Sequence, residues 1–399
     1  MLGASRCLWL NPVVPRHTKY RLPDSRQGHG SPFYWFATLL LLLAVAGWVW
    51  WQSSKTKSPE SPRQPVPAAP ATRPAIALKP LFVPPRSNAI TQPLTSPPTA
   101  KVIAPTSLPQ AAGFPRPVRD VFEAQVALAR NGISSGSLDG VMGSQTRAAL
   151  MAFQQKVDLV ETGQLDADTK ARLSLEAPPL VACLVTSNDL ARLQPLSKTW
   201  LGKSQQTALD YESILELVAE RGRASPSLVR RLNPAVDWTN VVAGTQVQIP
   251  DAQYPSPSAK AGFAVIALAA KALEVFDAKT NLLAHFPCSI AALVEKRPVG
   301  ELHVTAIAPN PDYTFNPEVF PESAEALQIK TKLILPPGPN NPVGVAWISL
   351  DLPGYGIHGT PSPEQVGRTE SHGCFRLANW NAEYLLKLVW VGMPVYVEP

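Results

Sequence analysis

Acidic residues are scarce in the first part of this 399-residue chain. Residues 1–119 contain 2 Asp or Glu against 14 Lys or Arg, whereas residues 120–259 contain 15 against 12 and residues 260–399 contain 13 against 10. The net charge of +6 therefore comes from the N-terminal part alone, and the rest of the chain is mildly acidic. This balance argues against a nucleic-acid partner, because a nucleic-acid-binding protein needs a basic folded face.

Charge is absent altogether from residues 33–51, which read FYWFATLLLLLAVAGWVWW. These 19 residues are enough to cross the core of a bilayer as a helix. Aromatic residues at both ends of the run suit the headgroup regions, and the basic residues upstream favour a cytoplasmic arm at residues 1–32. We therefore expect a single transmembrane helix that anchors the chain, with a cleaved signal peptide as the alternative.

Residues 52–118 lack the composition of a folded domain. They hold 16 of the chain's 43 prolines, together with much Ala, Ser and Thr and almost no acid. Such a segment cannot bury enough apolar surface to offset the conformational entropy lost on folding. We expect a disordered, extended, proline-rich linker between the anchor and the folded part.

Cysteine is also scarce, with four residues in the chain. Cys7 precedes the expected anchor, and Cys183, Cys288 and Cys374 follow it. Three cysteines cannot all pair with one another, so at least one thiol is expected to be free unless an intermolecular bond forms. Cys183 and Cys288 fit the role of small buried hydrophobes. Catalysis is a reason for a free thiol, and Cys374 is the candidate for it.

Residues 119–176 predict a small helical bundle, because apolar residues recur at helical spacing between breaks at Gly132 and Gly163. The unit resembles the peptidoglycan-binding domain family of three-helix modules. The matching residues are Gln125, Leu128, Gly132, Asp139, Gly140, Gly143, Thr146, Ala149, Leu150, Phe153, Gln154, Gly163, Leu165, Asp166 and Leu173. The resemblance implies binding to the cell wall, and a helical spacer without a ligand is the alternative.

Residues 198–250 predict two helices followed by an edge strand. The run from Ile214 to Arg221 is helical, Ser225 can cap a second helix that ends at Asn233, and a proline closes the final strand. This unit resembles a LysM-type module of strand, two helices and strand. The resemblance implies glycan binding, and a purely structural adaptor is the alternative.

Residues 260–399 predict a mostly β domain, so that the whole chain is expected to be a multidomain α+β protein. Short apolar or alternating runs are separated by Pro and Gly, namely Ala264–Ala269, Ala272–Phe276, Leu302–Ile307 and Val343–Leu350. One helix is expected from Asn379 to Val389 with Asn379 as its N-cap, and Pro394–Glu398 is expected to form a final strand. His285 and His303 lie in strand-like runs and are expected to be structural.

The residues suited to covalent catalysis lie near Cys374. A cysteine nucleophile needs a base within reach, a group that orients the base, and donors for a developing oxyanion. His358 precedes Cys374 by 16 residues, and the loop between them can bring the two together. Gly373 permits a tight turn, in which backbone N–H groups converge on one point. A zinc site formed by Cys374, His372 and His358 is the alternative, but no fourth ligand is evident.

This pattern closely resembles the YkuD-type L,D-transpeptidase catalytic domain. The family signature is a histidine, a spacer, and then Ser/Thr-His-Gly-Cys followed by an apolar residue and Arg. In this chain the signature reads His358-Gly359-Thr360 and, after the spacer, Ser371-His372-Gly373-Cys374-Phe375-Arg376. The resemblance implies that Cys374 is the nucleophile, that His358 is the base and that the Gly359 carbonyl orients the imidazole.

The resemblance also implies roles for the residues around the cysteine. Ser371 and His372 shape the turn, and Arg376 either holds the turn or meets a substrate carboxylate as a bidentate donor. The chain departs from the family pattern upstream, where Thr-Pro-x-Gly is replaced by Arg297-Pro298-Val299-Gly300. The proline and glycine keep the turn, so the difference concerns a contact on the substrate side and leaves the nucleophile unaffected.

The resemblance implies acyl transfer in cell wall biogenesis without a metal or cofactor. Cys374 would form a thioester with a tetrapeptide stem of peptidoglycan and pass it to an amine of a second stem or of a wall-attached protein. The expected partners are therefore stem peptides, glycan and the inner membrane, with the catalytic domain in the periplasm or cell wall space. An L,D-carboxypeptidase, in which water takes the thioester, and a non-catalytic anchored wall-binding protein are the alternatives.

Overall fold

The computed structural model describes residues 113–257, 259–320, 323–369 and 373–399. The expected arm, the expected anchor at 33–51 and nearly all of the expected linker lie outside the described residues, as do Ser371 and His372. Among the described residues, no helix has the length and apolar character needed to cross a bilayer.

The first unit contains the three helices expected for residues 119–176, which are α2 (Val121–Arg130), α3 (Ser144–Lys156) and α4 (Ala167–Arg172). Strand β1 (Arg116–Pro117) pairs with β2 (Ser174–Leu175) and closes the unit. Asp120 caps α2 and Asp166 caps α4, each by accepting from a backbone N–H three residues on. Leu128, Leu150 and Phe153 are buried between the helices.

The second unit begins earlier than the sequence predicted. Strand β4 (Gln246–Pro250) pairs antiparallel with β3 (Leu180–Leu184), which lies ahead of the expected start at residue 198. The sequence predicted no strand around Cys183, because the pairing that makes this run a strand depends on a partner more than 60 residues away. The helices of this unit are α5 (Ser187–Ala191), α6 (Trp200–Ser204), α7 (Ile214–Arg221) and α8 (Pro226–Leu232).

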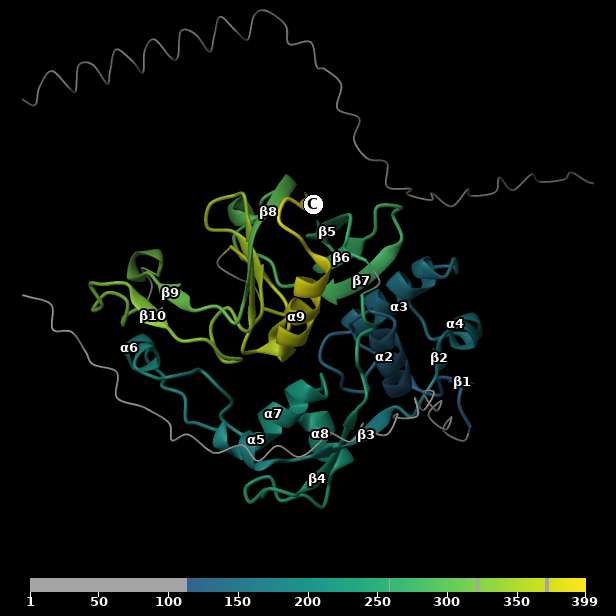
Figure 1. Ribbon diagram of the computed structural model, residues 1–399. Coiled ribbons are helices and arrows are strands. Elements are labelled where there is room, and N and C mark those ends of the chain that lie inside the picture. Colours follow the sequence, from purple (N-terminus) through teal and green to yellow (C-terminus); the bar gives the residue numbers. More distant parts are fainter. Residues whose placement is uncertain (1–112, 258, 321–322, 370–372) are drawn as a thin grey trace, which may run out of the picture. The chain divides into compact units, whose positions relative to one another are not determined.

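The C-terminal domain is mostly β, as predicted, and is drawn in green to yellow in Figure 1. It is built on an eight-stranded sheet of order β13-β12-β11-β8-β14-β5-β6-β7. The strands are β5 (Phe263–Ala267), β6 (Ala272–Phe276), β7 (Leu282–Pro287), β8 (Gly300–Pro309), β11 (Ala346–Leu350), β12 (Gly356–His358), β13 (Phe375–Arg376) and β14 (Pro394–Glu398). The β12–β13 and β14–β5 pairs are parallel, and the other pairs are antiparallel.

Helix α9 (Asn379–Leu388) packs against β8, β11 and β12 (Figure 1). Its apolar side, with Leu385 and Leu388, joins Ile348 and Val395 of the sheet in one buried core. The expected helix is therefore confirmed, but the expected N-cap is wrong. Ala378 occupies the cap position without a side-chain hydrogen bond, because the side chain of Asn379 is buried and bonded elsewhere, as described below.

A separate hairpin is formed by β9 (Tyr313–Phe315) and β10 (Leu333–Leu335). The second unit contacts this hairpin through α6, where the ring of Trp200 stacks on Phe315 with 4.3 Å between the ring centroids. Tyr313 belongs to the same cluster, with its ring centroid 6.4 Å from that of Trp200. The hairpin is therefore held by a residue that precedes the C-terminal domain by 60 positions in the chain.

Candidate active site

His358 lies in a strand near one edge of the sheet, and Cys374 lies directly before the neighbouring strand. His358 ends β12, and the parallel pairing of β12 with β13 sets His358 beside Arg376 and Ile357 beside Phe375. Cys374 directly precedes β13 and therefore lies level with Gly356. Because side chains two residues apart on a strand share a face, this register brings the thiol and the imidazole to the same side of the sheet.

The imidazole of His358 is fixed in one tautomer. Its Nδ1 lies 2.6 Å from the carbonyl oxygen of Gly359. Since a carbonyl oxygen only accepts hydrogen bonds, Nδ1 carries the proton and Nε2 keeps a lone pair. The ring also stacks on Trp347, with centroids 5.5 Å apart. This contact is the one that an orienting role of the Gly359 carbonyl requires.

Burial keeps His358 neutral at physiological pH. The side chain is almost completely enclosed. Its pKa is lowered to about 4, first by this burial and to a lesser degree by the charge of Arg376, while the bond to Gly359 acts in the opposite direction. An imidazole with a free lone pair and no positive charge can accept a proton. The ring is therefore suited to act as a general base.

Cys374 is a protonated thiol in the resting state. Burial raises the pKa of Cys374, while a backbone hydrogen bond from Gly356 and the charge of Arg376 lower it. Its Sγ lies 3.4 Å from the carbonyl oxygen of Gly354. Because the thiolate is the reactive form, reaction requires that the proton leave the sulfur, and the neutral imidazole on the neighbouring strand is a suitable acceptor.

Apart from Cys374 and His358, the cysteines and histidines that the structure describes are buried or paired with a carboxylate. Cys288 is buried, and its burial raises the pKa of the thiol to about 12; Cys183 is also buried, beside Arg221. His285 lies 3.1 Å from Glu274, and His303 lies 3.1 Å from Asp351. Within the described ranges there is no group of three or more His, Cys, Asp or Glu that could hold a metal ion.

Two residues near the site were missed by sequence reasoning. Tyr313 is half-buried, and its pKa is raised first by burial and then by the nearby charge of the Cys374 thiolate. Asn379, which is fully buried, accepts hydrogen bonds through Oδ1 from the backbone N–H of Thr360 at 3.0 Å and of Val345 at 3.3 Å. No local pattern marks Tyr313, and Asn379 had the pattern of a helix cap.

The arginine at the position where the family pattern has threonine supports the backbone of its own loop. The Nε of Arg297 donates to the carbonyl of Ala291 at 2.8 Å, and its Nη2 donates to the carbonyl of Ala292 at 3.1 Å. Arg297 thereby stabilises the turn that leads into β8. Gly373 and Arg376 flank Cys374 as predicted from the sequence, and both are partly exposed.

Comparison with known families gives two matches. Residues 261–397 match the YkuD family, described as "L,D-transpeptidase catalytic domain". Residues 118–173 match a family described as "Putative peptidoglycan binding domain". Both matches agree with the resemblances that the motifs had indicated.

Relatives of this chain carry the same family name. The "Putative L,D-transpeptidase YkuD" of Bacillus licheniformis is 24% identical over 46% of this chain and 93% of its own length. The "Putative L,D-transpeptidase YqjB" of Bacillus subtilis is 35% identical over 25% of this chain and 51% of its own length. A solved L,D-transpeptidase from Mycobacterium smegmatis is 20% identical, with 40% of this chain and 65% of that chain covered, but its TM-score of 0.28 is too low to carry an argument. Together, the matches support an L,D-transpeptidase catalytic domain at residues 261–397 and a peptidoglycan-binding domain at residues 118–173.

Proposed function

We propose that this protein is a peptidoglycan L,D-transpeptidase that works through a thioester on Cys374. The observation that carries the proposal is the pairing of β12 with β13, which sets a neutral, singly protonated His358 beside the strand that Cys374 precedes. The match of residues 261–397 to the L,D-transpeptidase catalytic domain supports the reaction class. The peptidoglycan-binding domain supports the substrate.

In the first half-reaction, the Sγ proton passes to Nε2 of His358 and the thiolate attacks the carbonyl that precedes the terminal D-amino acid of a tetrapeptide stem. The C–N bond then breaks, and His358 returns the proton to the departing amine, which leaves a thioester. In the second half-reaction an acceptor amine attacks the thioester and its proton passes through His358 back to the sulfur. The backbone N–H groups of Gly373 and Cys374 are the expected donors to the oxyanion in both steps.

The finer assignments form part of the same proposal. We infer a single-pass anchor in the inner membrane at residues 33–51, an extended linker over residues 52–118, and a catalytic domain in the periplasm or cell wall space. The second unit would bind glycan in the manner of a LysM module. The acceptor would be an amine of a second stem or of a wall-attached protein. Ser371 and His372 would shape the turn at Cys374, and Arg376 would hold it or meet a substrate carboxylate.

The test is to incubate the purified full chain in detergent with disaccharide-tetrapeptide and to identify the products by mass spectrometry. A cross-linked dimer is expected, and it must disappear in Cys374→Ala. Cys288→Ala is the matched control, because its thiol is buried and bonded only locally, and it should keep the product. Tripeptide without dimer would instead indicate a carboxypeptidase, and the absence of any product would favour a non-catalytic wall-binding protein.

A further inference from the structure

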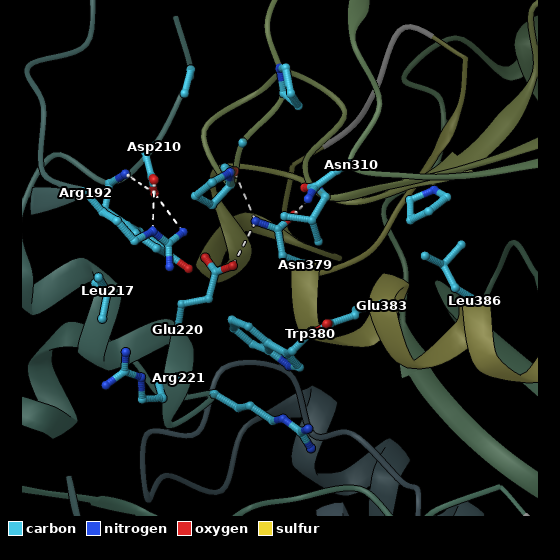
Figure 2. A pocket seen from close by; sticks show the side chains of 18 of the residues that line it. Arg192, Asp210, Leu217, Glu220, Arg221, Asn310, Asn379, Trp380, Glu383 and Leu386 are labelled. Carbon is cyan, nitrogen blue, oxygen red and sulfur yellow. Dashed lines mark hydrogen bonds and ion pairs between the residues drawn. The ribbon is translucent and has the colours of Figure 1, made fainter. Parts of the chain in front are cut away.

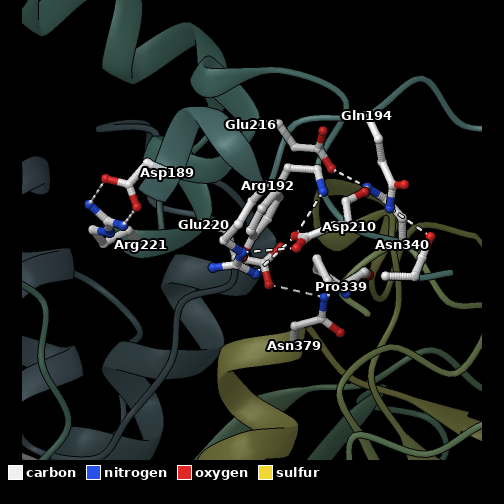
Figure 3. A network of polar contacts seen from close by, with 12 residues as sticks. Asp189, Arg192, Gln194, Asp210, Glu216, Glu220, Arg221, Pro339, Asn340 and Asn379 are labelled. Carbon is white, nitrogen blue, oxygen red and sulfur yellow. Dashed lines mark hydrogen bonds and ion pairs between the residues drawn. The ribbon is translucent and has the colours of Figure 1, made fainter. Parts of the chain in front are cut away.

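A carboxylate from the second unit is bonded to the residue that holds the segment after His358. Glu220 lies in the last turn of α7, and its Oε1 accepts a hydrogen bond from Nδ2 of Asn379 at 3.0 Å (Figure 3). Nδ2 also donates to the carbonyl of Pro339 at 3.0 Å. With the two bonds to Oδ1 described above, the amide of Asn379 uses both of its donors and accepts two backbone N–H groups. Its orientation is therefore fixed, because a flipped amide would set its NH₂ group against two N–H donors.

One peptide group joins this amide to the catalytic base. The N–H of the Gly359–Thr360 peptide donates to Oδ1 of Asn379 at 3.0 Å, and the C=O of the same peptide accepts from Nδ1 of His358 at 2.6 Å. Four groups therefore form a continuous chain of hydrogen bonds: the Glu220 carboxylate, the Asn379 amide, the peptide and the imidazole. Hydrogen bonds in such a chain polarise and strengthen one another.

We propose that Glu220 is a positioning residue for His358, so that the second unit sets the basicity of the imidazole that serves Cys374. The inference rests on the proposed function, because it assigns His358 as the base. Negative charge on Glu220 strengthens its bond to Nδ2 of Asn379 and makes Oδ1 a better acceptor. The peptide carbonyl of Gly359 then becomes a better acceptor for Nδ1–H, and Nε2 becomes more basic.

The two arginines that line the cavity beside Glu220 and are drawn in Figure 3 are bonded to other carboxylates. The carboxylate lines a cavity of about 600 Å³ between α7 and α9, together with Asn379 and Trp380 (Figure 2). Arg192 is engaged by Asp210 through two bonds of 2.9 Å, and Arg221 is engaged by Asp189 at 2.6 Å. Neither guanidinium is therefore bonded to Glu220 in the network of Figure 3.

Glu220 also changes its charge near neutral pH. Its pKa is raised to about 7, first by burial and then by the charges of Glu216 and Glu383, while the bond from Asn379 and the charge of Arg192 oppose the rise. The charged and titratable groups that face it from the surrounding elements are Arg192, Asp210, Tyr211, Glu216, Arg221, Arg223 and Glu383. As the pH rises through about 7, Glu220 is expected to ionise and the imidazole to become a stronger base.

Two readouts on the full chain test the proposal, and neither needs peptidoglycan. The first is the ¹⁵N signal of His358 in protein labelled at histidine, which should show a step near pH 7 in the wild type that is lost in Glu220→Gln. The second is the rate at which iodoacetamide alkylates Cys374. At pH 8.5 this rate should fall about threefold to tenfold in Glu220→Gln, corresponding to half to one unit of basicity.

Glu216→Gln is the matched control. Glu216 lies one turn earlier on α7, and its carboxylate accepts from the side-chain amide of Asn340 at 2.6 Å, a bond of the same kind that does not lead to His358. This variant should keep the ¹⁵N step, moved to lower pH because a neighbouring negative charge is gone, and should keep the alkylation rate at pH 8.5.

A wild type without a step near pH 7 would overturn the proposal, even if Glu220→Gln failed to fold. Equal losses of alkylation rate in Glu220→Gln and Glu216→Gln would also overturn it, since they would indicate a general weakening of the contact. If the step is present but the chain makes no product from tetrapeptide, the proposed function fails and the link between Glu220 and His358 stands. If the chain makes product from tetrapeptide but the ¹⁵N signal shows no step, the proposed function stands and the link between Glu220 and His358 fails.

Discussion

Both units that precede the catalytic domain make backbone hydrogen bonds to it, and the second unit adds bonds from two carboxylates. The first unit adds backbone hydrogen bonds at β7, the edge of the sheet opposite to β13: the N–H of Ser134 donates to the carbonyl of His285 at 2.8 Å, and the N–H of His285 donates to Gly132 at 3.2 Å. The second unit presents the carboxylates of Glu216 and Glu220 to side-chain amides. A hydrogen bond between backbone groups holds two segments in place. A hydrogen bond to a carboxylate also brings a charged group to the contact, and this charge depends on pH.

The largest expected loss of stability comes from Asn379→Ala. This substitution removes the side-chain amide that is bonded both to Glu220 of the second unit and to the backbone of the segment after His358. Two backbone N–H groups, one carbonyl and one carboxylate would lose their partner in a buried site, at a cost of about 3 to 5 kcal/mol. Urea denaturation measures the loss. Asn340→Ala is the control: it also breaks a bond to α7 and should cost less, without moving the ¹⁵N signal of His358. A smaller loss in Asn379→Ala than in Asn340→Ala would contradict the central role of Asn379.

The next largest effect is the pH dependence of the unfolding free energy, to which His358 and Glu220 contribute with opposite sign. His358 has a lowered pKa of about 4, so the folded state binds fewer protons than the unfolded state between pH 4 and 6.5, and the unfolding free energy rises with pH in that window by about 3 kcal/mol. Glu220 has a raised pKa of about 7, so its contribution falls by a similar amount, at most about 3 kcal/mol, as the pH rises from 4.5 to 7.

In the wild type these two contributions largely offset each other. Glu220→Gln removes the falling contribution, so its unfolding free energy should rise clearly between pH 4 and 6.5 in urea titrations at a series of pH values. Parallel curves for the variant and the wild type would show that Glu220 does not titrate in this range.

A third prediction concerns the attachment of the first unit. Gly132 has φ of +81°, and a Cβ at this position would lie 2.7 Å from the carbonyl oxygen of Leu283. Gly132→Ala should therefore destabilise the protein by about 1 to 3 kcal/mol through backbone strain and a clash at β7. The ¹⁵N signal of His358 should keep its pH step, because this contact includes none of the groups in the hydrogen-bond chain from Glu220 to His358. A lost step would remove the contrast between the two attachments.

The smallest effect is expected from Gln145→Ala. Nε2 of Gln145 donates to the carbonyl of Val366 at 2.6 Å, and this bond links the first unit to the loop between His358 and Cys374. Its loss should cost about 0.5 to 1.5 kcal/mol. Hydrogen exchange of the N–H groups near residue 366 is the measurement, and exchange as slow as in the wild type would show that the loop does not depend on this contact.

Sequence patterns predicted most of the elements around the site. The strand expected at Ala272–Phe276 and the helix expected from Asn379 are present almost as predicted, because each is specified by local periodicity and by Pro and Gly at its ends. The roles proposed for Cys374 and His358 came from a motif, and in the structure His358 ends β12 while Cys374 directly precedes the neighbouring strand β13. The roles themselves remain predictions.

The failures have a common physical cause. Asn379 has the residue type and position of a helix cap, but the chain uses its amide for contacts with residues 19 to 159 positions away. Strand β3 pairs with β4 across the whole second unit. Tyr313 and Glu220 lie in no motif. Each of these residues acquires its role from partners distant in the sequence, which local spacing does not specify.

The place of β14 has a consequence for the order in which the protein is made. Among the eight strands, β14 is the last to leave the ribosome, yet it lies in the middle of the sheet between β8 and β5. Before it is synthesised, β5 and β8 lack the strand that lies between them, and the pairing of Ser289 with Arg376 joins the two halves of the sheet at the other side. The nascent chain therefore holds Cys374 in an unfinished domain. A chain that ends at Gly392 should therefore lack cooperative unfolding, and synthesis of the final strand should mark the moment at which the catalytic domain forms.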